Sequence, residues 1–189
     1  MVEAIVEAAA RVLETRGLTG FNTNAVAEKA GVSVGSLYQY FANKDALVAA
    51  LSARERGLLG IELAAAAGEC AALPLEDALR RLARAAIHRQ LARPALARML
   101  DFEEQRLVLD DADRALTGDI AGHVTALLRR HRASLRIADL EEAALDVIAI
   151  ARALIDSAAA RGEADPVALE ARVTRAALGY LTGRANVGA

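Results

Sequence analysis

Apolar residues recur every three or four positions along almost the whole chain, and this spacing restricts the fold more than any other feature. In the first segment Val2, Ile5, Ala9 and Leu13 fall on one side of a helix, with charged residues opposite. No stretch alternates apolar and polar residues for long enough to indicate a β-strand. Alanine and leucine dominate, aromatic residues make up 3%, and there is no Trp. We therefore predict an all-α protein of about nine helices.

Composition and charge narrow the class of protein. The 189 residues suffice for one or two domains, and 54% hydrophobic against 25% charged residues is typical of a folded chain. Lys and Arg number 23 and Asp and Glu 25, a net charge of −2. This balance excludes a protein that holds nucleic acid by overall charge, so any contact with DNA must be local.

Nothing in the sequence indicates a metal or a cofactor, and we predict neither. Cys70 is the single cysteine and cannot form an internal disulfide, and with three scattered histidines it cannot build a Cys-rich zinc site. The acids between residues 101 and 113 are spread around a helix and a loop rather than gathered at one site. No pairing typical of a catalytic site is present, so we do not expect an enzyme.

The beginning of the chain gives no sign of export. Glu3 and Glu7 stand where a signal peptide would carry positive charge. No apolar run approaches the roughly 18 residues of a membrane span. We expect a cytoplasmic protein that makes no contact with a membrane.

Turn and capping residues divide the first 50 residues into short helices. Asn22 or Thr23 can cap a second helix that ends at Gly31. After a tight link, Ser33 can cap a third short helix, and Asn43 a fourth. Two short helices joined by so tight a turn are typical of a helix-turn-helix.

Longer helices follow. The fourth runs from Lys44 towards Cys70 and connects the first unit to a second. Pro74 and Pro94 sit at first-turn positions of the fifth and sixth helices, where a proline loses no hydrogen bond. The remaining helices are predicted at about 111–135, 139–161 and from Asp165-Pro166 onward. We place the domain boundary near residue 50, giving domains 1–50 and 51–189.

The segment from Ala30 to Leu47 contains three of the six aromatic residues. On a helix that starts after Ser33, Leu37 and Phe41 are i,i+4 neighbours and face the core. Other side chains of the segment are then free to meet a DNA groove. A plain helical hairpin is the alternative, and it explains only the two inward residues.

The outward side chains have the chemistry of a DNA-reading helix. Ser36 and Gln39 can hydrogen-bond base edges, Val34 can touch a thymine methyl group, and Gly35 lets a backbone approach the DNA closely. The hydroxyls of Tyr38 and Tyr40 and the ammonium of Lys44 can meet phosphates, Lys44 at the positive end of the fourth helix.

With these residues, the chain resembles the TetR family of bacterial transcription regulators over Ile5 to Leu47. The matching positions are Ala8, Ala9, Leu13, Gly17, Thr23, Val26, Ala27, Ala30, Gly31, Val32, Ser33, Gly35, Leu37, Tyr38, Tyr40, Phe41, Lys44 and Leu47. The resemblance implies a three-helix DNA-binding domain followed by a helical effector-binding and dimerisation domain. It also implies phosphate contacts from Thr23, Ser33, Tyr38 and Lys44. Base or groove contacts are implied for Asn24, Val34, Gly35, Ser36, Gln39 and Tyr40.

The chain departs from the family in its charge. Family members often carry a basic N-terminal extension that is missing or removed here, and residues 1–50 hold four basic and five acidic side chains, 4 − 5 = −1. Non-specific affinity for DNA should be modest, so dimerisation must supply part of the specific affinity.

We expect a ligand-responsive, DNA-binding transcriptional regulator, a repressor released from a palindromic operator in double-stranded DNA by a small-molecule effector. The alternative is a helical-bundle protein that binds or converts a small molecule without touching DNA. For the effector pocket we predict Met99, Phe102, Ile120, His123 and Leu127. His123 either points inward as the polar handle of this pocket or is a core histidine satisfied by a neighbour such as Asp119.

The last two helices are predicted to join two chains in a homodimer. In the eighth, apolar residues follow steps of four and three, which suits packing of helix on helix. The ninth has two apolar or small faces, of which one is left for a partner unless both are internal. The predicted interface residues are Val147, Ala151, Leu154, Ala158, Val173, Ala176 and Tyr180.

Overall fold

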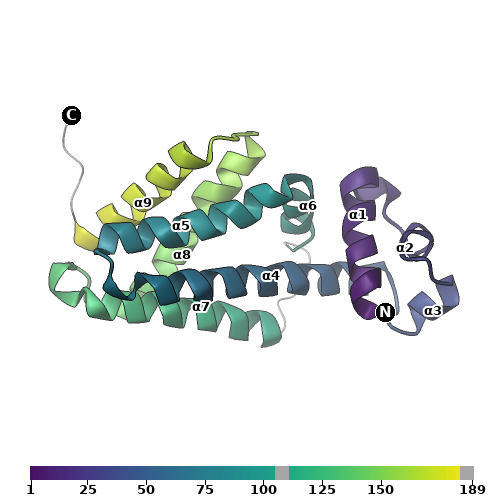
Figure 1. Cartoon of the computed structure of the whole chain (residues 1–189), viewed down its shortest axis with the longest axis horizontal. Helices are drawn as coiled ribbons and strands as arrows, with labels where there is room; N and C mark the ends of the chain where they lie inside the picture. The colour runs from purple at the N-terminus through teal and green to yellow at the C-terminus, as the bar shows by residue number, and fades with distance from the viewer. Residues whose placement is uncertain (105–110, 184–189) are drawn as a thin grey trace. The chain divides into compact units, whose positions relative to one another are not determined.

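The computed structural model describes residues 1–104 and 111–183, in which helices are joined by turns and loops and no strand is present (Figure 1). The all-α prediction is confirmed. The α-helices are α1 (Val2–Gly20), α2 (Thr23–Ala30), α3 (Val34–Tyr38), α4 (Lys44–Glu69), α5 (Leu75–Ala92), α6 (Pro94–Glu104), α7 (Asp111–Arg130), α8 (Leu140–Ala160) and α9 (Pro166–Thr182). Two short 3-10 helices, Cys70–Ala72 and Arg132–Ser134, follow α4 and α7.

The chain forms two compact units. Unit 1 is Met1–Gly57 with the described part of Arg93–Asp110, and unit 2 is Leu58–Ala92 with the described part of Asp111–Ala189. The division therefore falls inside α4, and α6 packs with α1 in unit 1. A single boundary at residue 50 would assign α6 to the second domain. The sequence does not indicate that α6 belongs to unit 1, because its contact with α1 joins segments far apart in the chain.

The helix ends of unit 1 follow the turn residues of the sequence. Gly17, with φ 64° and ψ −176°, interrupts the helical geometry near the end of α1. The Asn22 side chain accepts a hydrogen bond from the Ala25 N–H at 2.9 Å and so caps α2. Asn43 caps α4 by accepting from the Ala46 N–H at 2.8 Å. These interactions satisfy backbone donors that a helix start leaves without a partner.

The core of unit 1 gathers around α1, the helix with the most buried side chains in this unit. Ile5 and Leu13 of α1 are fully buried, as are Leu37 of α3 and Leu47 of α4. Burying an aliphatic side chain of this size stabilises a fold by about 1.5–3 kcal/mol, so these contacts hold the short α2 and α3 in place.

Glu7 of α1 lies among arginines of three helices or their ends. It accepts hydrogen bonds from Arg11 at 3.1 Å and Arg54 at 2.9 Å, and Arg93 lies 3.4 Å away. Burial opposes ionisation of this carboxyl, but the hydrogen bonds from Arg11 and Arg54 and the charge of Arg93 outweigh it. The pKa of Glu7 is therefore lowered from its ordinary value.

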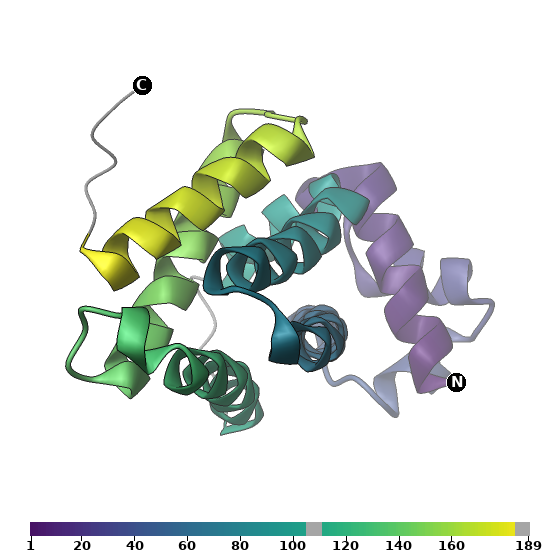
Figure 2. The same ribbon diagram turned by 60° about the vertical axis from the view of Figure 1, so that its left-hand side comes forward.

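Unit 2 is a bundle in which α9 lies beside α5, while α8 contacts α5, α7 and α9 (Figure 2). Asp139 and Asp165 cap α8 and α9 through their Oδ1 atoms, and Pro166 opens α9 as predicted. Cys70 is buried in this unit, its thiol directed at the carbonyl of Ala66 at 3.0 Å. Burial raises the pKa of the Cys70 thiol, as expected of a small structural residue.

We predict that Glu7 makes the stability of the protein depend on acid pH. Its pKa is lower in the folded chain than in the unfolded one, so its stabilising effect is present above about 4.5 and is lost as pH falls through the folded pKa. In urea denaturation, Glu7→Gln should narrow the difference between the free energies of unfolding at neutral and acid pH.

Glu28→Gln is the control, because Glu28 is exposed and makes a long ion pair, 3.8 Å from Arg16. Glu28→Gln should leave the difference between the free energies of unfolding at neutral and acid pH as it is in the wild type. An equal narrowing in both variants would contradict the role of Glu7.

Candidate nucleic-acid interface

The turn between α2 and α3 is built from three successive residues. Gly31 adopts the left-handed conformation, with φ 69° and ψ 31°, and its N–H donates to the carbonyl of Glu28 at 3.2 Å. This is a conformation that glycine adopts without steric cost. Ser33 then accepts a hydrogen bond from the Ser36 N–H at 3.0 Å and caps α3. The predicted helix-turn-helix is therefore present, with a cap on each helix.

Leu37 fixes α3 against the rest of unit 1. Its side chain is fully buried, its N–H donates to the Ser33 carbonyl at 3.1 Å, and its own carbonyl accepts from the N–H groups of Tyr40 and Phe41, each at 3.0 Å. Phe41 is buried as well. The inward orientation of Leu37 and Phe41 is confirmed, although α3 ends at Tyr38 rather than at Tyr40 or Phe41.

Most of the predicted DNA-contacting side chains are on the surface. The large apolar or aromatic ones among them, Val34, Tyr38 and Tyr40, are 37%, 48% and 47% exposed. Exposed as well are Asn24, Ser33, Gly35 and Gln39, whereas Thr23, Ser36 and Lys44 are partly buried. The surface of α3 that excludes Leu37 is thus open to another molecule.

Two of the residues expected to touch phosphates also contact each other. The hydroxyls of Thr23 and Tyr38 lie 3.1 Å apart and form a hydrogen bond. This bond ties the first residue of α2 to the last residue of α3. No local pattern in the sequence indicates this contact, because it depends on the angle between the two helices.

Lys44 makes contacts inside unit 1 that its sequence position does not indicate. Its Nζ donates to the carbonyl of Leu18 at 3.4 Å and lies 5.5 Å from the centre of the Phe21 ring. A cation over an aromatic face and beside a helix end is stabilised in both ways. Lys44 therefore joins the start of α4 to the end of α1, whatever contact it makes with DNA.

Gly35 is not required by the fold. A Cβ placed on it would meet only the Oγ of Ser33, at 3.8 Å, which is ordinary contact, and its φ is not positive. Glycine inside a helix costs about 1 kcal/mol relative to alanine. A glycine that the protein interior does not need is what a close approach by another molecule would require.

The fold and this surface define a helix-turn-helix DNA-binding domain joined to a larger helical domain. Comparison with known families agrees on both parts. Residues 5–51 match the bacterial regulatory proteins of the tetR family, and residues 74–181 match the tetracyclin repressor-like C-terminal domain. The chain belongs to the TetR family of transcription regulators. This finding decides against the alternative of a protein without a DNA-binding domain.

Solved structures show the same fold at low sequence identity. The regulator FadR from Bacillus subtilis, in complex with stearoyl-CoA, is 16% identical with a TM-score of 0.76, covering 96% of this chain and 100% of that one. The fatty acid degradation regulator FadR from Bacillus halodurans is 19% identical with a TM-score of 0.74, covering 96% and 100%. PfmR from Thermus thermophilus, also of the TetR family, is 19% identical with a TM-score of 0.66, covering 94% and 96%. No curated protein matches the chain by sequence.

The five predicted pocket residues are not brought together within either unit. Met99 packs against the core of unit 1, whereas Ile120 and Leu127 belong to unit 2, where Leu127 is buried in the core. The side chain of Phe102 lies outside the described residues. His123 is exposed, so its predicted inward orientation is wrong, and its Nδ1 lies 2.9 Å from the carbonyl of Asp119.

Three of the predicted interface residues are internal to one chain. Val147, Ala158 and Val173 are buried in the cores of unit 2, so their assignment to a dimer interface is corrected. Their spacing on α8 and α9 arises because these helices pack on each other and on α5. The other four, Ala151, Leu154, Ala176 and Tyr180, are partly buried.

Tyr180 has a partner in its own chain. Its hydroxyl donates to the carboxylate of Asp146 on α8. This hydrogen bond, with burial and the charge of Asp146, raises the pKa of Tyr180 to about 12. Tyr180 thus helps to join α8 to α9 within unit 2.

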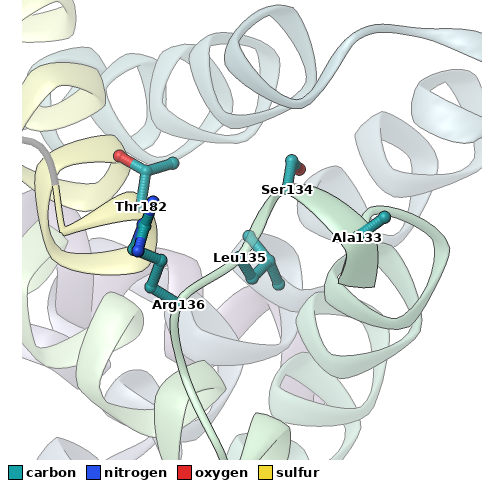
Figure 3. A pocket seen from close by; sticks show the side chains of 5 residues that line it. All are labelled: Ala133, Ser134, Leu135, Arg136 and Thr182. Atoms are coloured by element: carbon teal, nitrogen blue, oxygen red, sulfur yellow. The ribbon is translucent and has the colours of Figure 1, made fainter.

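A hollow of about 430 Å³ opens beside the 3-10 helix that follows α7 (Figure 3). It is lined by Ala133, Ser134, Leu135, Arg136 and Thr182, which were not predicted as pocket residues. The hydroxyls of Ser134 and Thr182 donate to backbone carbonyls, each at 2.8 Å. Among these lining residues, Arg136 is therefore the one whose side-chain donors a ligand in the hollow could use.

Among the described residues no group of three or more His, Cys, Asp or Glu side chains is placed to hold a metal ion. Within the same residues, no helix combines the length and the apolar character needed to cross a membrane.

We predict that Gly35→Ala weakens DNA binding without weakening the fold. The added methyl group has room inside the protein but projects from the surface proposed to face DNA. Thermal or urea unfolding should show stability unchanged or raised by up to about 1 kcal/mol. Gly57→Ala in α4 is the matched control, since nothing lies within 4 Å of a Cβ at that position. If Gly35→Ala and Gly57→Ala both bound DNA as the wild type does, Gly35 would not be a point of close approach to DNA.

Proposed function

We propose that this protein is a small-molecule-responsive transcriptional repressor that binds a palindromic operator as a homodimer, with α3 reading the DNA. The observation that carries the proposal is the exposed set on and beside α3: Val34, Gly35, Gln39 and Tyr40 are on the surface. Within the described residues the side chains of Gln39 and Tyr40 make no hydrogen bond or ion pair. Exposed apolar and aromatic groups that lie together, such as Val34 and Tyr40, are typical of a binding surface. Their chemistry fits base edges, thymine methyl groups and phosphates.

A dimer is needed because α3 has only five residues. A helix of this length reaches few base pairs, and the first 50 residues carry no excess of positive charge to raise the affinity. Two copies on a symmetric site double the contacts. Their half-sites should lie about one helical turn of DNA apart or somewhat more.

A small molecule that binds one conformation of the dimer more tightly would shift the equilibrium between DNA-bound and free protein. By linkage, DNA and effector then change each other's affinity by the same factor. Fatty acyl compounds are the first class to test. The support for this choice is the B. subtilis regulator, which shares the fold and was solved with stearoyl-CoA.

The proposal is tested by selecting duplexes from a random-sequence library with the wild-type protein. A roughly two-fold symmetric consensus is the expected result, and its absence would overturn the assignment as a sequence-specific repressor. Stearoyl-CoA, with CoA and stearate as controls, is then added to the complex with the selected duplex. Release of DNA by the acyl-CoA alone would support an acyl-CoA effector.

Gln39→Ala should weaken binding to the selected duplex by about 1–3 kcal/mol, because a base-edge contact is lost. Binding to unrelated duplexes should stay as it is in the wild type, since Gln39 then carries no phosphate contact. Fluorescence anisotropy with labelled duplexes measures both. An equal loss on selected and unrelated DNA would contradict a base contact by Gln39.

For the dimer we propose that the partner covers the exposed side of α8. Leu145, Ala149 and Ala153 are spaced by four residues on this side, all three are exposed, and Leu145 is 51% exposed. These exposed residues replace Val147, Ala158 and Val173, which the sequence predicted for the interface and which are buried within one chain. Residues four apart on a helix form one continuous stripe that a second helix can pack against.

Leu145→Asp should convert the dimer to monomers in analytical ultracentrifugation, because a charge buried in an apolar interface without a partner costs several kcal/mol. Ile61→Asp is the control: Ile61 of α4 is 67% exposed, more than Leu145, and lies outside the proposed stripe. If Leu145→Asp remained dimeric and Ile61→Asp became monomeric, the interface would lie on α4 and not on α8.

A further inference from the structure

We infer that Arg93 is a positioning residue for DNA binding, which fastens α6 to α1 and so fixes the helix on which α2 packs, α3 packing in turn on α2. The inference rests on the proposed function, and it adds a residue that lies outside the helix-turn-helix itself. All side chains that carry it belong to unit 1.

Arg93 and Glu14 form a two-pronged ion pair. The Nε and Nη2 atoms of Arg93 donate to Oε1 and Oε2 of Glu14 at 2.6 and 2.7 Å. The two side chains are 25% and 27% exposed, so water screens the pair only in part. Parallel hydrogen bonds between a guanidinium and a carboxylate fix orientation as well as distance.

The third nitrogen of Arg93 faces two more carboxylates. Nη1 lies 3.4 Å from Glu7 and 3.9 Å from Glu55, and Arg54 bridges the same two acids at 2.9 and 2.8 Å. The hydrogen bond to Glu14 is the largest of the effects that raise the pKa of Arg93, and the charges of the three glutamates add to it. The network thus joins α1, the first half of α4 and the start of α6.

The backbone of Arg93 is fixed by the start of α6. Its carbonyl accepts a hydrogen bond from the Ala97 N–H at 3.0 Å, and Pro94 is the first residue of the helix. Proline at this position presets the backbone for helix. The side chain of Arg93 is therefore held at a defined point beside α1.

Apolar contacts continue the attachment of α6. Leu96 and Leu100 are 1% and 4% exposed and belong to the core around α1. The Cε atom of Met99 lies 3.9 Å from where a Cβ would stand on Gly17, the residue at which α1 departs from helical geometry. One face of α6 thus packs into the DNA-binding unit along the second half of α1.

Direct contacts between helices connect α1 to the DNA-reading surface, so the position of α1 determines the position of that surface. Helix α1 packs on α2, α2 contacts α3, and the end of α1 binds Lys44 through the Leu18 carbonyl. Without Arg93, Glu14 would lose its two-pronged ion pair, whereas Glu7 and Glu55 would keep their pairs with Arg54. The link between α6 and α1 would be weakened, so that α1 could shift and α2 and α3 with it.

The test compares Arg93→Met, Glu14→Gln and the double variant on the duplex selected by the wild-type protein. We expect each single variant to lose at least about tenfold in affinity and the double variant to lose no more than the larger single loss, because both remove the same pair. Arg93→Lys keeps the charge but loses the second prong, and its affinity should fall between those of Arg93→Met and the wild type. Arg84→Met is the matched control, since Arg84 makes a two-pronged pair with Glu170 in unit 2 at 2.7 and 3.1 Å.

Hydrogen exchange without DNA gives an independent measure. Arg93→Met should raise amide exchange in the second half of α1 and in α2, and leave the helices of unit 2 unchanged. Wild-type affinity of Arg93→Met for the selected duplex would overturn the role of Arg93 while the proposed function stands. Additive losses in Arg93→Met and Glu14→Gln would overturn it too. Failure of the wild-type protein to select any duplex would instead overturn the proposed function, and the positioning role with it.

Discussion

The burial of Leu37 is the constraint on which the DNA-binding surface depends. Helix α3 has five residues, and a helix of that length is not stable by itself in water. It persists because Leu37 is enclosed in the core of unit 1 and because Ser33 caps the first turn. With one side chain held inward, the spacing of 3.6 residues per turn directs Gly35 and Gln39 away from the core. The recognition surface is thus a consequence of where one leucine is buried.

Charge plays a second part in the same unit. Residues 1–50 carry a net charge of −1, which by itself would disfavour DNA. Two of the acids responsible, Glu7 and Glu14, pair with Arg54 and Arg93, which lie outside those 50 residues. The charges of these two acids on α1 are therefore compensated locally, although unit 1 as a whole still has a net charge of −1. A helix whose polar side is acidic can then belong to a DNA-binding domain.

Local features of the sequence predicted local features of the structure well. Caps at Asn22, Ser33 and Asn43 and the left-handed turn at Gly31 follow from interactions between residues at most four apart. Such contacts involve only neighbouring residues, so the sequence is sufficient to predict them. The helix-turn-helix and its inward residue Leu37 could be predicted for this reason.

Packing between distant segments could not be predicted in the same way. Apolar spacing on α8 shows that a helix face is covered, but not whether its own chain or a second one covers it, and Val147 and Ala158 proved internal. His123 was predicted on the inward face of its helix because the direction of that face was estimated about a quarter turn wrong. The buried face of α7 centres on Val124, Leu127 and Leu128, which leaves position 123 about a quarter turn away, on the exposed side.

The ion pairs of Arg54 and Arg93 with α1 lie close to points where the chain passes between the two units. The chain passes between the units at three points. The first is inside α4, between Gly57 and Leu58, and the second follows α5, between Ala92 and Arg93. Arg54 stands shortly before the first passage and Arg93 is the first residue after the second. Both arginines pair with glutamates of α1, so each of these first two passages lies within one helical turn of a charged group held by that helix.

A displacement of the chain at either of these two passages would, in the proposed repressor, act on α1 through charge-assisted hydrogen bonds, which depend steeply on distance and angle. In the proposed repressor, an effector bound in unit 2 would need only a small movement of α5 or α4 to act on these bonds. Since α2 packs on α1 and α3 on α2, a shift of α1 changes the position of the surface that reads the DNA.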